Sequence, residues 1–164
     1  ELKKLLTGLN KIINEKKIKC PIAIKISPDI KDNEIGKIIE LISSHSIKGI
    51  VVSNTTDSNR NNLSDIKKHE SGGLSGQPLK NISTKLIKRF YKETKGKIKI
   101  IGVGGVDSGQ SAYEKITAGA DAVQLYTGMV YKGPGIVKEI KKDLISILKK
   151  ENIRNISEAV GINA

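Results

Sequence analysis

Four short apolar runs, each followed by a stretch with helical spacing, constrain the fold of this chain more than any other feature. Runs typical of β-strands occupy residues 21–27, 49–53, 98–103 and 121–128. Helices are predicted over residues 2–16, 33–44, 82–95, around 112–116 and over 134–150, with a short helical turn at 157–160. Because alternating strands and helices favour parallel strand pairing, the pattern predicts one α/β domain over residues 1–164.

Polar residues and glycines gather where each predicted strand ends, at Lys25, residues 53–56, Gly104 with Gly105, and residues 126–128. Four strand–helix units are enough for a small open sheet. A (β/α)8 barrel, however, carries its chemistry at this rim, and its usual phosphate site follows strands seven and eight. We therefore expect the chain to supply the last four units, strands five to eight, of such a barrel.

The stretch IKIIGVGGVDSG at residues 98–109 leads an apolar strand directly into two glycines and a helix start. Gly104 and Gly105 leave backbone N–H groups uncovered, and Asp107 or Ser108 is a candidate cap for the following helix. Uncovered N–H groups at such a turn bind phosphate. A tight turn also requires glycine for steric reasons, so the pattern alone leaves both explanations open.

The longest segment without periodicity covers residues 54–80 and is rich in Asn, Ser, Asp and Gly. Loops of this length in compact domains are usually lids or binding loops. The segment is therefore predicted to border a site.

The charge balance of 29 basic and 17 acidic residues, a net +12, suits an anionic partner. The lysines are spread along the whole chain, however, and are expected on outward helix faces. An aromatic content of 3% offers little for stacking on bases, so nucleic acid is not the expected partner.

Few residues are available for disulfides or metal ligation. A single Cys20 forms no internal disulfide, and His45 and His69 are expected on the surface rather than in a metal site. We recognise no signal peptide and no apolar run of the roughly 20 residues that span a bilayer.

Six motifs in order resemble the C-terminal half of dihydroorotate dehydrogenase, in particular its membrane-associated, quinone-reducing class. They are IKISPD (24–29), VSNTT (52–56), GGLSGQPL (72–79), IIGVGGVDSGQ (100–110), AGADAVQLYTGMVYKGP (118–134) and ISEAVG (156–161). The resemblance implies FMN as cofactor, oxidation of dihydroorotate to orotate in pyrimidine synthesis, and ubiquinone as electron acceptor.

The resemblance also implies roles for cofactor-binding residues. Lys25 resembles the family's strand-end lysine beside the flavin, where a cation stabilises negative charge on the reduced ring. Ser53 stands where the family usually has a threonine that contacts FMN, and Gly76 resembles a close backbone approach to the flavin. Gly104 and Gly105 resemble one side of the phosphate site, and Tyr126 and Thr127 the other; Gly128 is then expected to open a short helix over the phosphate.

Asn54 and Thr55 resemble the family's substrate contacts, since an amide and a hydroxyl can hydrogen-bond the ring amides and carboxylate of a dihydropyrimidine. Two structural alternatives stay open. Asn54 is also typical of an Asx turn at a strand end, and Tyr126 is also typical of a packed barrel aromatic.

The family's catalytic base is a serine in the first half of the barrel, so we expect it upstream of Glu1. The N-terminal segment that forms the quinone tunnel and docks the enzyme on the inner membrane, cytoplasmic in bacteria or mitochondrial, is expected there as well. Four strands of a barrel leave two unpaired edges, so the 164 residues alone are expected to bind FMN poorly and to be inactive.

Three other functions are weighed against this one. They are a soluble fumarate- or NAD-linked dihydroorotate or dihydropyrimidine dehydrogenase, a flavin-free barrel enzyme acting on a phosphorylated small molecule, and a basic nucleic-acid-binding module. The glycine turn alone does not distinguish a cofactor phosphate from a substrate phosphate.

Overall fold

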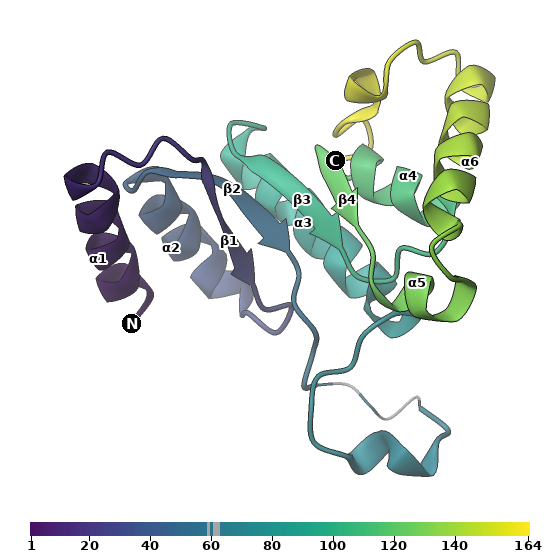
Figure 1. The fold of residues 1–164 in the computed structure, drawn as a ribbon, viewed down its shortest axis with the longest axis horizontal. Coiled ribbons are helices and arrows are strands. Elements are labelled where there is room, and N and C mark those ends of the chain that lie inside the picture. The colour runs from purple at the N-terminus through teal and green to yellow at the C-terminus, as the bar shows by residue number, and fades with distance from the viewer. Residues whose placement is uncertain (59, 61–62) are drawn as a thin grey trace.

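A four-stranded parallel sheet forms the centre of the molecule (Figure 1). The computed structural model describes residues 1–58, 60 and 63–164. The strands β1 (Ile22–Ile26), β2 (Ile47–Val52), β3 (Lys99–Val103) and β4 (Ala122–Gln124) lie side by side in chain order, and each neighbouring pair is parallel. The predicted α/β class and parallel pairing are confirmed.

Helices precede, connect and follow the strands. Helix α1 (Leu2–Glu15) precedes β1, and α2 (Asp32–Ser43), α3 (Lys80–Thr94) and α4 (Gly109–Thr117) connect successive strands. After β4 come α5 (Thr127–Lys132) and α6 (Ile136–Lys150). Short 3₁₀ turns cover η1 (Ile66–His69), η2 (Gln77–Leu79) and η3 (Ile156–Ala159).

Two strand boundaries differ from the prediction by more than one residue. β2 begins at Ile47 rather than at residue 49, because Ile47 pairs with Ile22 of β1. β4 ends at Gln124 rather than at residue 128, and α5 already begins at Thr127, one residue before Gly128. A Cβ at Gly128 would lie 2.7 Å from the Val106 carbonyl oxygen, so the chain turns closely against the loop after β3 at this point.

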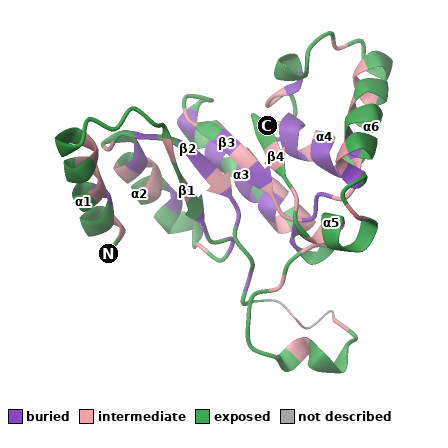
Figure 2. Ribbon diagram, viewed as in Figure 1, coloured by how far each residue is buried: buried purple, intermediate pink, exposed green. Residues whose placement is uncertain are grey.

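The apolar core lies on one face of the sheet, between the strands and helices α1, α2 and α3. Ile50 and Ile100 on the strands and Ile87 and Phe90 on α3 are fully buried there. A second cluster joins α4 to α6 through Ala112, Ile136 and Ile140. Figure 2 shows the buried residues concentrated on the central strands, α3 and α4.

The opposite face of the sheet is open within the described residues. Lys25 aligns with Val51 of β2, which in turn aligns with Ile101 of β3. Lys25, Ala122 and Gln124, which point to this face, are exposed. The strands also keep their chain order without the reversal that defines a doubly wound sheet, so successive connections turn in one direction.

The expectation that lysines lie on outward helix faces is wrong for Lys115. Its side chain is fully buried, because α4 is covered by α3 on one side and by α6 on another. Within the described ranges, none of the helices has both the length and the apolar character needed to cross a bilayer.

Candidate functional site

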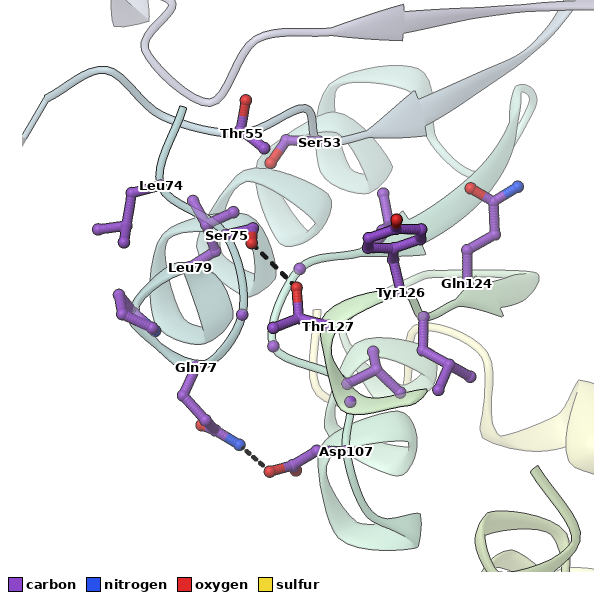
Figure 3. A pocket seen from close by; sticks show the side chains of 18 of the residues that line it. Ser53, Thr55, Leu74, Ser75, Gln77, Leu79, Asp107, Gln124, Tyr126 and Thr127 are labelled. Atoms are coloured by element: carbon purple, nitrogen blue, oxygen red, sulfur yellow. Dashed lines mark hydrogen bonds between the residues drawn. The ribbon is translucent and has the colours of Figure 1, made fainter. Parts of the chain in front are cut away.

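A cavity of about 950 Å³ lies at the carboxyl ends of the four strands. Its walls come from β1, from the loops after β2, β3 and β4, from the loop before α3 and from α5 (Figure 3). The predicted site residues all line it: Lys25, Ser53, Asn54, Thr55, Gly76, Gly104, Gly105, Tyr126 and Thr127. Residues up to 102 positions apart therefore meet in one place, as strand-end positions in a parallel sheet must.

The turn after β3 requires both of its glycines. Gly104 and Gly105 have φ values of +113° and +71°, in the region that favours glycine. A Cβ at Gly105 would lie 2.6 Å from the Cβ and 2.8 Å from the Cα of Lys80, at the start of α3. The steric explanation for the glycines is therefore correct.

The same turn also carries free hydrogen-bond donors. Within the described part of the chain, the N–H groups of Gly104 and Gly105 donate to no protein acceptor, and the same is true of Thr127 and Gly128 at the start of α5. All of these residues line the cavity. Two loops that line one space thus carry N–H groups without a protein acceptor, called uncovered N–H groups below, and such groups are the donors that a phosphate requires.

The end of β2 is held between its neighbouring strands. The N–H of Ser53 donates to the Val103 carbonyl of β3 at 3.1 Å, and that of Asn54 donates to the Ile26 carbonyl of β1 at 2.8 Å. The Ser53 hydroxyl donates to the Asn54 carbonyl, and the Val52–Ser53 peptide bond is cis. This backbone fixes the positions of Ser53 and Asn54 at the cavity.

Asn54 does not form an Asx turn. The N–H of Thr56, which such a turn would use, donates instead to the Leu74 carbonyl at 3.1 Å. The Asn54 side chain is exposed and lines the cavity. Its amide is therefore available to a ligand.

The loop that carries Thr55 is attached at two points. A Cβ at Gly73 would lie 2.0 Å from the Thr55 hydroxyl oxygen, so a glycine is needed for this close contact. On the other side, the Asp29 carboxylate accepts hydrogen bonds from the Thr56 and Ser58 hydroxyls and from the Asp57 N–H. Partial burial raises the pKa of Asp29, but these hydrogen bonds outweigh burial and lower the pKa overall.

The loop before α3 contacts the start of α5. The Thr127 hydroxyl donates to the Ser75 hydroxyl at 2.9 Å, as Figure 3 shows, and a Cβ at Gly76 would lie 3.0 Å from the Thr127 methyl group. Tyr126 is 79% exposed, so most of its ring surface is not covered by this chain. Its ring stands beside Gln124 at the edge of the cavity.

Three polar residues of the site were missed by the sequence prediction. Gln77 donates a hydrogen bond to the Asp107 carboxylate, and the Lys132 ammonium donates to the Asp107 carbonyl at 3.0 Å. The helix cap is Ser108, whose hydroxyl accepts from the Ser111 N–H at 3.2 Å, and not Asp107. Gln77, Asp107 and Lys132 all fall inside the six motifs of the family resemblance, and these motifs were the available signal.

Among the described residues, no group of three or more His, Cys, Asp and Glu side chains is arranged to hold a metal ion. The protein donors of the site are uncovered N–H groups, hydroxyls, an amide and the Lys25 ammonium. This chemistry suits an anionic organic ligand.

Comparison with known proteins gives a consistent result. The family model described as dihydroorotate dehydrogenase matches residues 1–148. A dihydroorotate dehydrogenase (quinone) from Trichodesmium erythraeum is 44% identical over 94% of this chain, and the mitochondrial quinone enzyme of Mus musculus is 39% identical over 99% of it.

Solved structures agree in fold. The structure of dihydroorotate dehydrogenase from Eimeria tenella in complex with ferulenol matches with a TM-score of 0.92 at 34% identity, over 99% of this chain and 48% of the other. Its ligand-free form matches with a TM-score of 0.83 at 41% identity, over 86% of this chain and 39% of the other. The chain spans less than half the length of the curated relatives, 44% and 42% for the two named.

Proposed function

This chain belongs to the dihydroorotate dehydrogenase family, and we propose that it supplies the phosphate-binding side of an FMN-dependent enzyme that oxidises dihydroorotate to orotate with ubiquinone as electron acceptor. The observation that carries the proposal is the convergence of two pairs of uncovered N–H groups, Lys25 and the Asn54–Thr55 segment on one cavity.

We further propose that the sheet is an arc of a (β/α)8 barrel, with β1 to β4 as its strands five to eight. Three features support this reading: strands in chain order, helices on one face, and an open second face. In a closed barrel that second face becomes the packed interior, and the edges of β1 and β4 pair with further strands.

The site fits FMN in size and donors. Its volume, about 950 Å³, lies near the upper end of the range usual for small-molecule sites, roughly 300 to 1,000 Å³. The N–H groups of Gly104, Gly105 and Thr127 would bind the phosphate, with Ser53 and the backbone of Gly76 and Tyr126 along the rest of the cofactor.

The chemistry that FMN supplies when bound is hydride acceptance from the substrate and transfer of the electrons to the acceptor. Lys25 would hold a positive charge beside the flavin ring, on the open face where no helix of the described chain covers it. Asn54 and Thr55 would orient the substrate, on a loop that Asp29 and Gly73 hold in place. We assign no proton-accepting residue within these 164 residues. The serine that serves as the family's catalytic base is expected in the other half of the barrel.

Ubiquinone as acceptor is supported by the names of the relatives and by the surface beside the site. Helix α5, which borders the cavity, exposes Val130 at 68% and Tyr131 at 84%. An apolar edge of this kind suits the approach of an apolar acceptor. Peripheral membrane association of the complete enzyme is part of the same proposal.

The test uses the full-length protein. Purified enzyme is expected to show a flavin absorbance spectrum, to be bleached by dihydroorotate under anaerobic conditions, and to be reoxidised by a short-chain ubiquinone. Reoxidation by fumarate or NAD⁺ in place of quinone would move the enzyme to a soluble class. A colourless protein that binds no FMN would refute the cofactor proposal and favour a flavin-free enzyme.

A further inference from the structure

A buried ammonium group lies directly behind the glycine turn. Lys115 of α4 has no exposed surface, and its Nζ donates to three acceptors: the Ser83 hydroxyl at 2.6 Å, the Thr84 hydroxyl at 3.0 Å and the Lys80 carbonyl at 3.3 Å. An ammonium has three N–H donors, so this hydrogen-bonding capacity is fully used. The site is therefore built for the charged form.

Two of these acceptors, Ser83 and Lys80, belong to the residues against which the two glycines pack. The Ser83 hydroxyl donates to the carbonyl of Val103, the residue before Gly104, at 2.7 Å. A Cβ at Gly104 would lie 3.2 Å from that same hydroxyl oxygen, and Gly105 packs against Lys80. A single hydroxyl group thus separates the Lys115 ammonium from the turn.

The positive charge behind the turn is not cancelled by a neighbouring carboxylate. Glu114 on the same helix is engaged by Lys80 in an ion pair of 2.8 Å. Burial lowers the pKa of Lys115 to about 8, with Glu114 opposing the shift and Lys80 adding to it. At neutral pH the ammonium is therefore mainly protonated.

We propose that Lys115 is a positioning residue for the phosphate group: acting through Ser83, it holds the Gly104–Gly105 turn in place and supplies a buried positive charge behind the bound phosphate. The inference rests on the proposed function, because it assumes that this turn binds the FMN phosphate. A buried charge attracts an anion more strongly than a surface lysine does, since water screens it less.

Riboflavin, which is FMN without its phosphate, separates this role from a general structural one. The experiment titrates FMN and riboflavin into flavin-stripped full-length protein and follows the quenching of flavin fluorescence. Lys115→Met is expected to weaken FMN binding about tenfold and to leave riboflavin binding unchanged. Lys138→Met, at an exposed position on α6, controls for the loss of one positive charge and should change neither affinity.

Two further measurements keep the test decisive if Lys115→Met does not fold. Ser83→Ala should also weaken FMN binding more than riboflavin binding. In the wild type, FMN affinity should fall as the pH rises through about 8, because Lys115 loses its proton there. The phosphate does not contribute to this fall, since it is already a dianion above its second pKa of about 6. Glu114→Gln, which removes the carboxylate that opposes the lowering of the Lys115 pKa, should move this pH dependence to lower pH.

Each outcome has one meaning. Wild-type protein that binds no FMN would refute the proposed function itself. Wild-type protein that binds FMN, combined with an unchanged FMN affinity in Lys115→Met, would overturn the present inference. Equal weakening of FMN and riboflavin binding would also overturn it, since that result indicates a structural role only.

Discussion

Replacing Gly105 by alanine tests whether the turn after β3 is fixed by its contact with α3. The substitution has two separate costs. At φ +71°, alanine is held in the left-handed region at a cost of about 1 to 2 kcal/mol. In addition, its Cβ would lie 2.6 to 2.9 Å from the Cβ, Cα and N of Lys80, and such overpacking against backbone costs about 1 to 3 kcal/mol.

Gly133 offers a control for a positive φ without a clash. Its φ is +72° and its ψ is 176°, a region that is essentially restricted to glycine, and a Cβ there would have no heavy atom within 4 Å. Gly133→Ala therefore carries a conformational cost without a steric one. Its N–H group lies outside the turn after β3, so its effect on FMN binding should be small.

The assay is urea unfolding of the full-length protein, followed by FMN titration. Gly105→Ala is expected to lose about 2 to 5 kcal/mol of unfolding free energy, and Gly133→Ala about 1 to 3 kcal/mol. Gly105→Ala should also weaken FMN binding, because the uncovered N–H groups move with the turn. Equal destabilisation by the two substitutions, with FMN affinity unchanged in both, would refute the reasoning.

Three other changes have expected outcomes. Lys25→Met should slow flavin reduction by dihydroorotate about a hundredfold in anaerobic stopped flow, since it removes a charge beside the ring; an unchanged rate would remove Lys25 from the site. Asn54→Ala should raise the KM for dihydroorotate about tenfold or more and leave FMN affinity unchanged, because the amide loses its hydrogen bonds to substrate; an equal effect on FMN would contradict the assignment. Stability should rise between about pH 8 and pH 10.5 by about 3 kcal/mol from Lys115 alone, because the unfolded chain keeps the proton that the folded chain has released; urea unfolding of Lys115→Met should lack this rise.

Lys115→Met should retain a folded structure at pH 7. Without the ammonium, the Ser83 hydroxyl still donates to Val103, and the Thr84 hydroxyl still donates to the Lys80 carbonyl at 2.7 Å. No buried polar group of these three residues is left without a partner, and the cost of burying a charge disappears. Marked unfolding of this variant at pH 7 would show that the ammonium contributes more to stability than these contacts indicate.

The sequence by itself determined the elements and their order. Apolar residues with a period of two or of 3.6 are a local signal, and the strands and helices fell within a few residues of their predicted ranges. Strand ends in a parallel sheet share one edge, so the nine residues predicted for the site were brought to one cavity. Their roles toward FMN and substrate stay predictions.

Only the tertiary structure decided which polar and aromatic side chains are buried and which are exposed, because the sequence around them does not distinguish the two. Lys115 meets acceptors 31 to 35 positions away, and nothing in the spacing of α4 shows that α3 will lie on it. Likewise, the exposure of Tyr126 and the contact of Gly73 with Thr55 depend on loops packed from distant parts of the chain. Periodicity encodes which face of an element is apolar, whereas the partner of each polar group is set by long-range packing; the buried cation behind the glycine turn is therefore visible only in the folded molecule.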